Sequence, residues 1–298
     1  MVKILLLGRT GQLGSDIVRN LPSGVDLVAP GRDVVDVSDR ARTREFIQSI
    51  RPDVVINTTA FHDVPLCESK YEEAFEINCF ALHTIANACG DVGARLVTFS
   101  TDYVFDGTKQ LPYVETDCPK PLQIYGITRM TGERIVSVVL PDAALIIRTC
   151  GLYGIAGSKA RDRNFVDKRI RDAGRGGSIN MSCEQTVCPT YTEDLSKAVL
   201  TLVLDKRAAS GIYHLVNEGS CSWYEFTKEI YKLLDLEVDL RPVDRNGCSD
   251  GIRRPINSVL ENTKGREIGV ILPHWRDALK RYLEQKHGTS GKHSRGQW

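Results

Sequence analysis

The stretch "LLLGRTGQLG", residues 5–14, decides the fold, because an apolar strand gives way to a helical pattern through a turn that contains three glycines. Glycine permits a tight turn and a close backbone approach, and the free amides at a helix start attract a diphosphate. An ordinary strand-to-helix turn is the simpler alternative. The position directly after an N-terminal apolar run favours a dinucleotide site. The residues of this turn that would contact the dinucleotide are Gly8, Arg9, Thr10, Gly11, Gln12 and Leu13.

Further apolar runs recur along the first half of the chain, among them "VDLVAP", "PDVVINTTA", "ARLVTFST" and "AALIIRT". They alternate with helix-like segments at about 38–50, 72–92 and 125–139. Strands that are apolar on both faces and separated by helices are typical of a parallel sheet covered by helices. The sequence therefore predicts an α/β fold, a Rossmann-like, doubly wound parallel sheet, over residues 1–150.

A smaller lobe is expected after residue 150, where the pattern loosens into segments rich in glycine and charge. We expect this substrate-binding lobe to cover residues 151–285 and to be interleaved with the first domain. Returns to the large domain are expected near 178–218, where a helix begins at Thr192 and "GIYHLVN" reads as a strand. Residues 286–298 are polar and are predicted to form a disordered tail.

Composition narrows the possible partners and compartments of the 298-residue chain. A net charge of +1 provides no global field that would attract nucleic acid or a membrane surface. Nine cysteines without CxxC spacing favour reduced thiols, and hence a cytoplasmic location. The first apolar run is too short for a signal peptide or a membrane span. No cluster of metal ligands is recognisable, so we expect no bound metal.

The end of the second predicted strand bears on the choice of coenzyme. Sites that prefer NADH usually place an acidic residue there, whereas "VAPGRD" presents Arg32, and Arg9 lies in the glycine turn. Two cations favour the 2′-phosphate of NADPH. Asp33 and Asp36 follow closely, so NADH use is left open.

The stretch "YGITRMTGE", residues 125–133, places a phenol and a guanidinium four positions apart on one helix face. The positive charge of Arg129 is expected to lower the pKa of Tyr125 toward the working pH. The strand in "TFSTDYVFDG" ends at Ser100 and Thr101, whose hydroxyls would lie at the carboxyl edge of the sheet, where such folds bind ligands. A hydroxyl, a phenol and a cation around a carbonyl would support hydride transfer from a nicotinamide.

These motifs carry a resemblance to a known family. The glycine turn, "DVVINTTAFHDVPLCE", "STDYVFDG", "YGITRMTGE" and "CEQTVCPT" occur in the order and spacing of the extended short-chain dehydrogenase/reductases. The chain most resembles the dTDP-4-dehydrorhamnose reductase family, from Val2 to about Leu283. The resemblance implies NADPH-dependent reduction of the 4-keto group of a dTDP-4-dehydro-6-deoxy sugar.

The resemblance also implies roles for single residues. The catalytic threonine, tyrosine and lysine of the family fall on Thr101, Tyr125 and Arg129, so an arginine replaces the lysine. Arginine keeps the charge but gives up no proton. The further cofactor contacts would be Arg32, Asp36, Val37, Thr59, Ala60 and Ser100. The substrate contacts would be His62, Val104, Phe105 and Arg254, with core packing as an equal alternative for the two apolar residues.

Three alternatives follow from the same residues. Dehydratases of this fold usually carry an acidic residue where the chain has Tyr103, which disfavours dehydration. An epimerase would use the same tyrosine and stays open. Arg129, together with Gly151 in place of a tryptophan that such reductases can show, fits a non-catalytic, NADP-binding regulatory subunit. The regulatory subunit of methionine adenosyltransferase resembles these reductases in this way. A homodimer is also left open.

Overall fold

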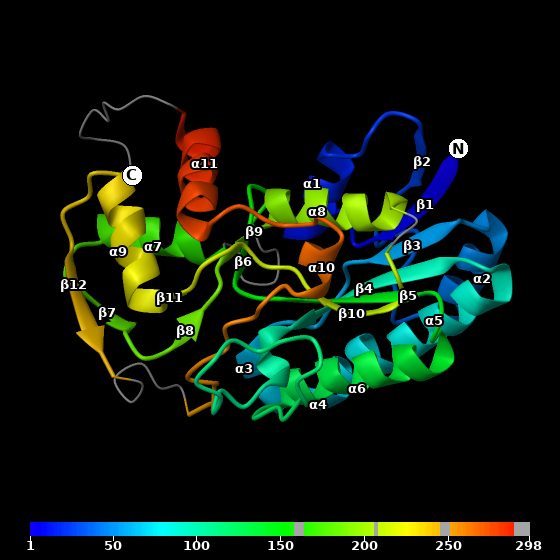
Figure 1. The fold of residues 1–298 in the computed structure, drawn as a ribbon, viewed down its shortest axis with the longest axis horizontal. Helices are drawn as coiled ribbons and strands as arrows, with labels where there is room; N and C mark the ends of the chain where they lie inside the picture. The colour runs from blue at the N-terminus through cyan, green and yellow to red at the C-terminus, as the bar shows by residue number, and fades with distance from the viewer. Residues whose placement is uncertain (158–163, 206–207, 245–250, 289–298) are drawn as a thin grey trace.

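The computed structural model describes residues 1–157, 164–205, 208–244 and 251–288. Two lobes lie side by side, a large one with a central sheet and a small one that contains the helices α7, α9 and α11 (Figure 1). The chain passes between the lobes several times. None of the described helices has the length and apolarity needed to cross a membrane.

The large lobe contains a parallel sheet with helices on both faces. Its strands are β1 (Val2–Leu7), β2 (Val25–Val28), β3 (Val54–Asn57), β4 (Arg95–Thr101), β5 (Ala144–Thr149) and β10 (Gly211–His214). Its helices are α1 (Gln12–Arg19), α2 (Arg40–Ile50), α3 (Val64–Ser69), α4 (Tyr71–Phe75), the π-helical turn η1 (Glu76–Phe80), α5 (Ala81–Val92), the 3-10 turn η2 (Asp102–Val104), α6 (Ile124–Val139), α8 (Thr192–Leu204) and α10 (Lys264–Glu267).

The six strands lie in the order β10-β5-β4-β3-β1-β2, and every neighbouring pair is parallel. The predicted doubly wound parallel sheet is confirmed. The strand order changes direction between β1 and β3, which are neighbours in the sheet. Ligands of such sheets bind outside the carboxyl ends of the strands at this point.

The sheet is covered on both faces because its strands are apolar on both sides. Ile4 and Leu6 of β1 pack toward α1 and α8, whereas Leu5 and Leu7 pack toward α2, α5 and α6. All four side chains are buried. Each fully buried leucine or isoleucine contributes about 1.5–3 kcal/mol, so this alternation fixes which helices lie on which face.

The small lobe has its own core, in which aromatic rings predominate. Tyr153, Tyr191 and Tyr282 stack or meet edge to face at centroid distances between 5.2 and 5.6 Å. Its strands are β6 (Leu152–Tyr153), β7 (Ser178–Ser182), β8 (Thr186–Val187), β9 (Thr190–Tyr191), β11 (Cys221–Ser222) and β12 (Asp239–Val243). Its helices are α7 (Phe165–Gly174), α9 (Trp223–Leu233) and α11 (Trp275–His287).

Some boundaries differ from the expectation. Helix α7 ends with "RDAG", inside the part of the chain where the sequence pattern loosens into segments rich in glycine and charge. Helix α11 continues to His287, so Lys286 and His287 are helical and do not belong to the predicted tail. The rest of that tail, residues 289–298, lies outside the described residues. The division into domains at residue 150 stays a prediction, although β10 joins the sheet of the large lobe.

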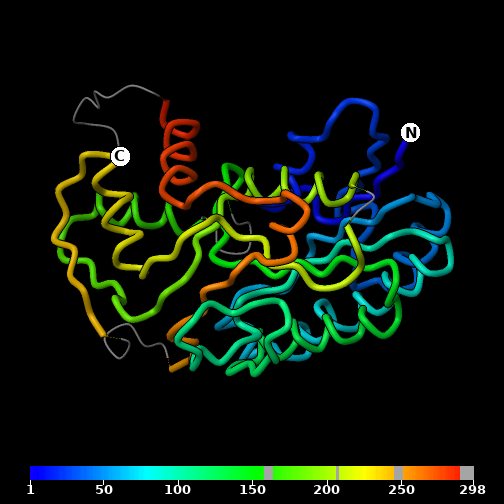
Figure 2. Tube along the Cα trace, in the orientation of Figure 1, coloured from blue at the N-terminus to red at the C-terminus, as the bar shows by residue number. Residues whose placement is uncertain are grey.

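Two segments far apart in the sequence lie together below the sheet edge. The loop after β4 runs beside residues 255–262, where Tyr113 bridges Leu260 (Figure 2). The backbone N–H of Tyr113 donates to the Val259 carbonyl oxygen at 2.8 Å. This contact brings the chain that follows Arg254 to the end of β4, where the candidate site lies.

Candidate active site

The site is assembled at the carboxyl edge of the sheet, where the order of the strands changes direction. Strand β1 leads into the glycine turn, β3 leads into residues 58–60, and β4 ends at Thr101. Helix α6 begins beside them and contacts both η2 and β4. Residues from four separate parts of the chain therefore meet at one edge.

The glycine turn is shaped by close contacts between backbone segments. Gly8 has a φ of 91°, a left-handed conformation that favours glycine. A β-carbon at Gly14 would lie 2.2 Å from the Gly8 carbonyl oxygen, so only glycine allows α1 to start this close to β1. No side chain caps the amides of α1, and no acidic residue stands in its first turn. These amides are available to an anion.

Two arginines lie beside the turn, as the sequence suggested. Arg9 is exposed, and one of its terminal nitrogens would lie 3.6 Å from a β-carbon at Gly31. Arg32 follows Gly31 directly and donates through Nε to Asp36 Oδ2 at 2.8 Å. Burial opposes the shift, but hydrogen bonds from Arg32 and Ser38 hold the pKa of Asp36 below its ordinary value. The carboxylate thus partly neutralises one of the two cations.

Two glycines let helix α6 approach its neighbours closely. A β-carbon at Gly126 would lie 2.2 Å from the Tyr103 carbonyl oxygen, and one at Gly132 would lie 2.5 Å from the Asn78 carbonyl oxygen. The Gln123 side chain caps the helix by accepting from the Gly126 N–H at 2.7 Å. The spacing in "YGITRMTGE" thus fixes the position of α6 as well as its chemistry.

Tyr125 and Arg129 lie four positions apart on α6, and Thr101 ends the strand β4 that α6 contacts. The charge of Arg129 and the hydroxyl of Thr101 both act to lower the pKa of the Tyr125 phenol. Thr101 and Arg129 are buried, whereas Tyr125 is half-buried. The ring of Tyr103 meets that of Tyr125 edge to face at 6.3 Å.

The expected lowering of the Tyr125 pKa is wrong for this structure. Burial raises the pKa of Tyr125 above its ordinary value, and the opposing charge of Arg129 does not compensate. The Asp102 carboxylate and Cys67 add to the rise. The phenol therefore keeps its proton at neutral pH, which suits a proton donor better than a base.

Asn78 in η1 is a site residue that sequence reasoning missed. Its side-chain oxygen accepts from Arg129 Nη1 at 3.2 Å and from the Phe61 N–H at 2.9 Å. Its amide nitrogen donates to the Phe61 carbonyl oxygen and to Thr128 Oγ1. Asn78 therefore ties α6 to the loop after β3. In the sequence Asn78 is one of several polar residues in a helical segment, so no local signal singled it out.

Several buried polar atoms around this edge have no hydrogen-bond partner among the described residues. They are Ser100 Oγ, Arg129 Nε, Thr149 Oγ1 and Gln12 Oε1. A buried polar group without a partner costs about 1–3 kcal/mol. Because four such atoms lie at the carboxyl edge or the adjoining turn, the arrangement is that of a site prepared for a polar ligand.

Asp102 is a second residue that the sequence analysis did not single out. It is 3% exposed, and its carboxylate accepts hydrogen bonds from Thr101 Oγ1 at 2.9 Å, Cys150 Sγ at 3.1 Å and Ser258 Oγ at 2.6 Å. Burial raises the pKa of Asp102, although these three donors oppose the rise. Asp102 follows Thr101 directly, but its other two partners, Cys150 and Ser258, are distant in the sequence.

The predicted substrate residues fall into two groups. Val104 and Phe105 are fully buried, and the Phe105 ring stacks on Tyr113 at 4.1 Å, with Arg148 over its face at 5.0 Å. These side chains form part of the core, which is the alternative given for them, and their contact with a sugar stays a prediction. His62 and Arg254 are half-buried, so each leaves part of its surface to a ligand.

Of the remaining predicted cofactor residues, Thr59 lies against Gly8 of the turn. Thr59 follows β3 and donates through its N–H and hydroxyl to Asn57 Oδ1. Ala60 is half-buried. Val37 is buried against the core on the side of α2 and α5, so its side chain contributes packing.

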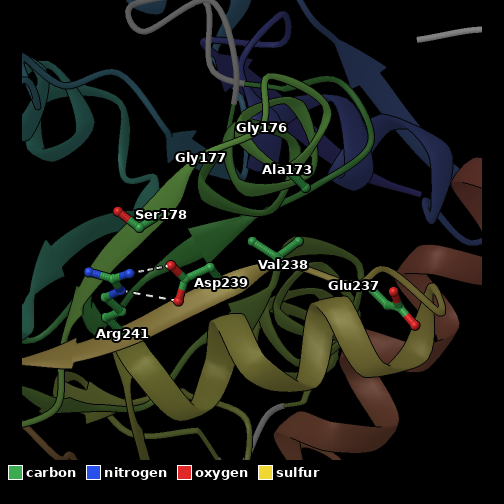
Figure 3. A pocket seen from close by; sticks show the side chains of 8 residues that line it. All are labelled: Ala173, Gly176, Gly177, Ser178, Glu237, Val238, Asp239 and Arg241. Carbon is green, nitrogen blue, oxygen red and sulfur yellow. Dashed lines mark hydrogen bonds and ion pairs between the residues drawn. The ribbon is translucent and has the colours of Figure 1, made fainter.

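Two cavities lie elsewhere. One of about 390 Å³ is lined by Ala173, Gly176, Gly177, Ser178, Glu237, Val238, Asp239 and Arg241 (Figure 3). There Arg241 pairs with Asp239 at 2.6 Å. A second cavity of about 380 Å³ lies along helix α8. Neither cavity is lined by a predicted site residue, so the candidate site is identified by the side chains at the sheet edge and not by cavity volume.

Within the described ranges no group of three or more potential metal-ligating side chains occurs.

Comparison with known proteins shows the family of the chain. Residues 2–287 match the family model described as RmlD substrate binding domain. The spore coat polysaccharide biosynthesis protein SpsK of Bacillus subtilis is 35% identical over 96% of the chain and 98% of the relative. The dTDP-4-dehydrorhamnose reductase of Escherichia coli is 32% identical over 97% of the chain and 99% of the relative.

Solved structures give the same result. The dTDP-4-dehydrorhamnose reductase of Bacillus anthracis, crystallised in complex with NADP, superposes with a TM-score of 0.89 at 31% identity, over 96% of the chain and 100% of that structure. A UDP-glucose 4-epimerase of Thermotoga maritima shares the fold at 18% identity with a TM-score of 0.82. The chain therefore belongs to the RmlD substrate-binding-domain family, the family of the dTDP-4-dehydrorhamnose reductases.

Proposed function

We propose that the protein reduces the 4-keto group of a dTDP-4-dehydro-6-deoxy sugar with NADPH and that Tyr125 donates the proton. The presence of Tyr125, Thr101 and Arg129 together at the carboxyl edge of the sheet is the observation that carries this proposal. Relatives of 31–35% identity named dTDP-4-dehydrorhamnose reductase support the substrate class.

The residues present fit NADPH. Uncapped amides at the start of α1 suit its diphosphate, and Arg9 with Arg32 suits a 2′-phosphate. The unpaired Ser100 Oγ and Arg129 Nε suit the polar groups of a nicotinamide riboside. When bound there, NADPH supplies the hydride that the protein's own side chains cannot provide.

Tyr125 fits the role of proton donor because its raised pKa keeps the phenol protonated at neutral pH. Reduction of a ketone places a proton on the oxygen as hydride reaches the carbon. The Arg129 guanidinium then stabilises the phenolate that remains, because the two groups are close enough for the charge to act on the phenol.

Arg254 and His62 remain the proposed contacts with the nucleotide sugar. Arg254 precedes Ser258 by four positions, and Ser258 contacts Asp102 beside Thr101. A guanidinium at this position suits a diphosphate through two parallel hydrogen bonds.

A homodimer and a cytoplasmic location also stay predictions. Sedimentation tests the first, and cell fractionation tests the second.

The test is NADPH oxidation with dTDP-4-dehydro-6-deoxy-L-lyxo-hexose, with a separate binding measurement for each ligand. We expect turnover by the wild type and a loss of about 10²–10⁴-fold in kcat for Tyr125→Phe, with NADPH binding retained. Tyr71→Phe is the matched control because Tyr71 is exposed at the start of α4. Binding of both ligands without turnover would overturn the proposal and favour the non-catalytic regulatory subunit.

A further inference from the structure

Trp223, the first residue of helix α9, lies at the boundary between the two lobes. Among the described residues it is the only apolar side chain that packs against two of the buried clusters. One of them is the aromatic core of the small lobe. The other contains Val104 and Phe105, which follow β4, and Cys150, which follows β5. Ligand sites occur preferentially at such boundaries.

Gly151 leaves space for the indole of Trp223 at the carboxyl edge of the sheet. It is the second residue after β5, and the last residue of β5, Thr149, is the register partner of Thr101. Gly151 has a φ of 54°, and a β-carbon built there would lie 3.2 Å from Cη2 of Trp223. That separation is tighter than an ordinary van der Waals contact. The far end of the indole therefore reaches the edge of the sheet beside the strand that ends at Thr101.

Backbone pairing connects Trp223 to the segment that follows Arg254. Ser222, directly before Trp223, pairs with Thr186 of β8. The Thr186 N–H donates to the Ile256 carbonyl oxygen at 2.8 Å. Three short segments thus form one ladder, which connects the indole to the segment that follows the proposed diphosphate contact.

The indole is half-buried, so part of its surface is left to a ligand. The Phe165 ring lies on it at a centroid distance of 4.4 Å, and the Phe226 ring meets it edge to face at 6.2 Å. Trp275, in the same lobe, is fully buried. A partly exposed indole offers an apolar face together with an N–H donor. A sugar carries the matching groups, because its ring presents C–H bonds on its faces and hydroxyls at its rim.

We propose that Trp223 contacts the sugar of the substrate, with the indole against the ring C–H groups and the methyl group of the 6-deoxy sugar. The inference rests on the proposed function. The sugar is the part of the nucleotide sugar assigned to the indole, because the ketone to be reduced lies on the sugar and must approach Thr101 and Tyr125. Arg254 would then hold the diphosphate and Trp223 the sugar.

Trp223→Phe tests the contact, because it keeps an aromatic ring against Phe165 and removes the end of the indole that reaches Gly151. We expect the KM for dTDP-4-dehydro-6-deoxy-L-lyxo-hexose to rise about tenfold, whereas kcat and the KM for NADPH change by less than about twofold. A contact made equally before and during the reaction affects KM and spares kcat. An unchanged KM for the sugar, or an equal rise in both KM values, would overturn the proposal.

Trp275→Phe is the matched control, because it makes the same change at a fully buried position of the same lobe. It should lower the stability of the protein and leave the KM for the nucleotide sugar unchanged. A rise equal to that of Trp223→Phe would overturn the proposal, since it would show that any loosening of the small lobe weakens substrate binding.

Gly151→Ala tests the contact from the opposite side. The added methyl group would press on the end of the indole, so the KM for the nucleotide sugar should rise. Gly93→Ala is the control for backbone strain, because Gly93 has a φ of 75° and no described atom lies within 4 Å of a β-carbon built there. The same KM in the two alanine variants would contradict the placement of the indole.

A measurement without turnover separates failure of this inference from failure of the proposed function. We expect dTDP-L-rhamnose, the reduced sugar nucleotide, to change the tryptophan fluorescence of the wild type more than dTDP alone does. Calorimetry in the same solution establishes that each ligand is bound. The additional change should be lost in Trp223→Phe and kept in Trp275→Phe.

Each outcome of the fluorescence experiment has its own meaning. The Trp223-dependent change without reductase activity would overturn the proposed function alone. Reductase activity with the same fluorescence change for dTDP and dTDP-L-rhamnose would overturn the contact with the sugar alone. Failure of dTDP-L-rhamnose to bind would overturn both.

Discussion

The guanidinium of Arg129 donates to the side-chain oxygen of Asn78 at 3.2 Å, which ties the cation of helix α6 to the π-helical turn η1. Both residues are buried. Because Asn78 also bonds both backbone polar groups of Phe61, the position of Arg129 is coupled to the loop that follows β3. The arginine at position 129 is thus held by a specific partner.

Arg129→Lys should increase kcat for the reduction. An ammonium keeps the charge near Tyr125, has three rotatable donors and can give up a proton, whereas the guanidinium is planar and stays protonated. We expect a rise of about tenfold, which corresponds to about 1.4 kcal/mol in the barrier. Steady-state kinetics with NADPH would check this. Arg129→Met, which removes the charge, should reduce kcat, and a lysine variant no faster than this methionine variant would contradict the argument.

Asn78→Ala should destabilise the fold, because it removes every hydrogen bond of a buried amide. The carbonyl and N–H of Phe61, the Thr128 hydroxyl and Arg129 would all lose a partner. We expect the free energy of unfolding to fall by about 2–4 kcal/mol in urea titrations. Asn87→Ala is the control, because Asn87 bonds only within α5, to His83. Equal losses in the two variants would show that the Asn78 network contributes little.

The parts of the fold and site that sequence reasoning found are those with a local signal. Strand Val2–Leu7, the glycine turn and the Tyr125–Arg129 pair each follow from a repeat or spacing within a few residues. Asn78 and Asp102 could not be found in this way. Asn78 meets Arg129 across 51 positions, and Asp102 meets Ser258 across 156 positions, so only the folded chain shows their roles.

The wrong direction of the Tyr125 pKa has a physical cause. It depends on burial, which is a tertiary property that the spacing of Tyr125 and Arg129 does not report. Phe105 was left between the sugar and the core, because a phenylalanine suits both, and its ring lies between Tyr113 and Arg148. A β-carbon at Gly151 would lie 3.2 Å from the ring of Trp223, a distant neighbour that the sequence around Gly151 does not reveal.

Removing one partner of the buried pair between Arg148 and Glu133 should be more damaging than replacing both. Arg148 Nη2 lies 2.7 Å from Glu133 Oε2, and Nε lies 2.9 Å from Oε1. Glu133→Gln leaves a buried cation without its counterion, for which we expect a loss of about 3–5 kcal/mol in unfolding free energy. The double variant Glu133→Leu with Arg148→Met should recover most of that loss. A double variant less stable than either single variant would contradict the reasoning.

Arg32→Ala should weaken the preference for NADPH over NADH. Arg32 lies beside the glycine turn, and its side chain is 82% exposed although Nε bonds Asp36. Loss of one cation facing a 2′-phosphate should raise the KM for NADPH several-fold, which corresponds to a binding free energy on the order of 1 kcal/mol. The KM for NADH should stay nearly unchanged. Arg40→Ala serves as the control, since Arg40 is an exposed arginine that pairs with Glu76. A parallel rise in both KM values would indicate that Arg32 only shapes the loop.

His214 should make the fold less stable as the pH falls below neutrality. Burial lowers the pKa of His214 from 6.5 to about 4, the nearby charge of Arg148 adds to the effect, and Glu115 opposes it. The neutral imidazole is fully buried and contacts the carbonyl oxygens of Tyr113 and Glu261. The unfolded chain takes up a proton near pH 6.5, whereas the folded chain does so only near pH 4. The stability contributed by this group is therefore complete above pH 6.5 and is lost as the pH falls toward 4.

Urea unfolding at pH 7 and pH 5 tests this linkage. Between these values the wild type should lose about 2 kcal/mol more than His214→Gln, whose side chain does not titrate. The variant is expected to be less stable at pH 7, because it loses packing beside Phe105, so the comparison concerns the slope with pH rather than the absolute value. His83→Gln, at an exposed position on α5, should keep the wild-type slope. Identical slopes for wild type and His214→Gln would show that His214 takes up its proton at the same pH in both states.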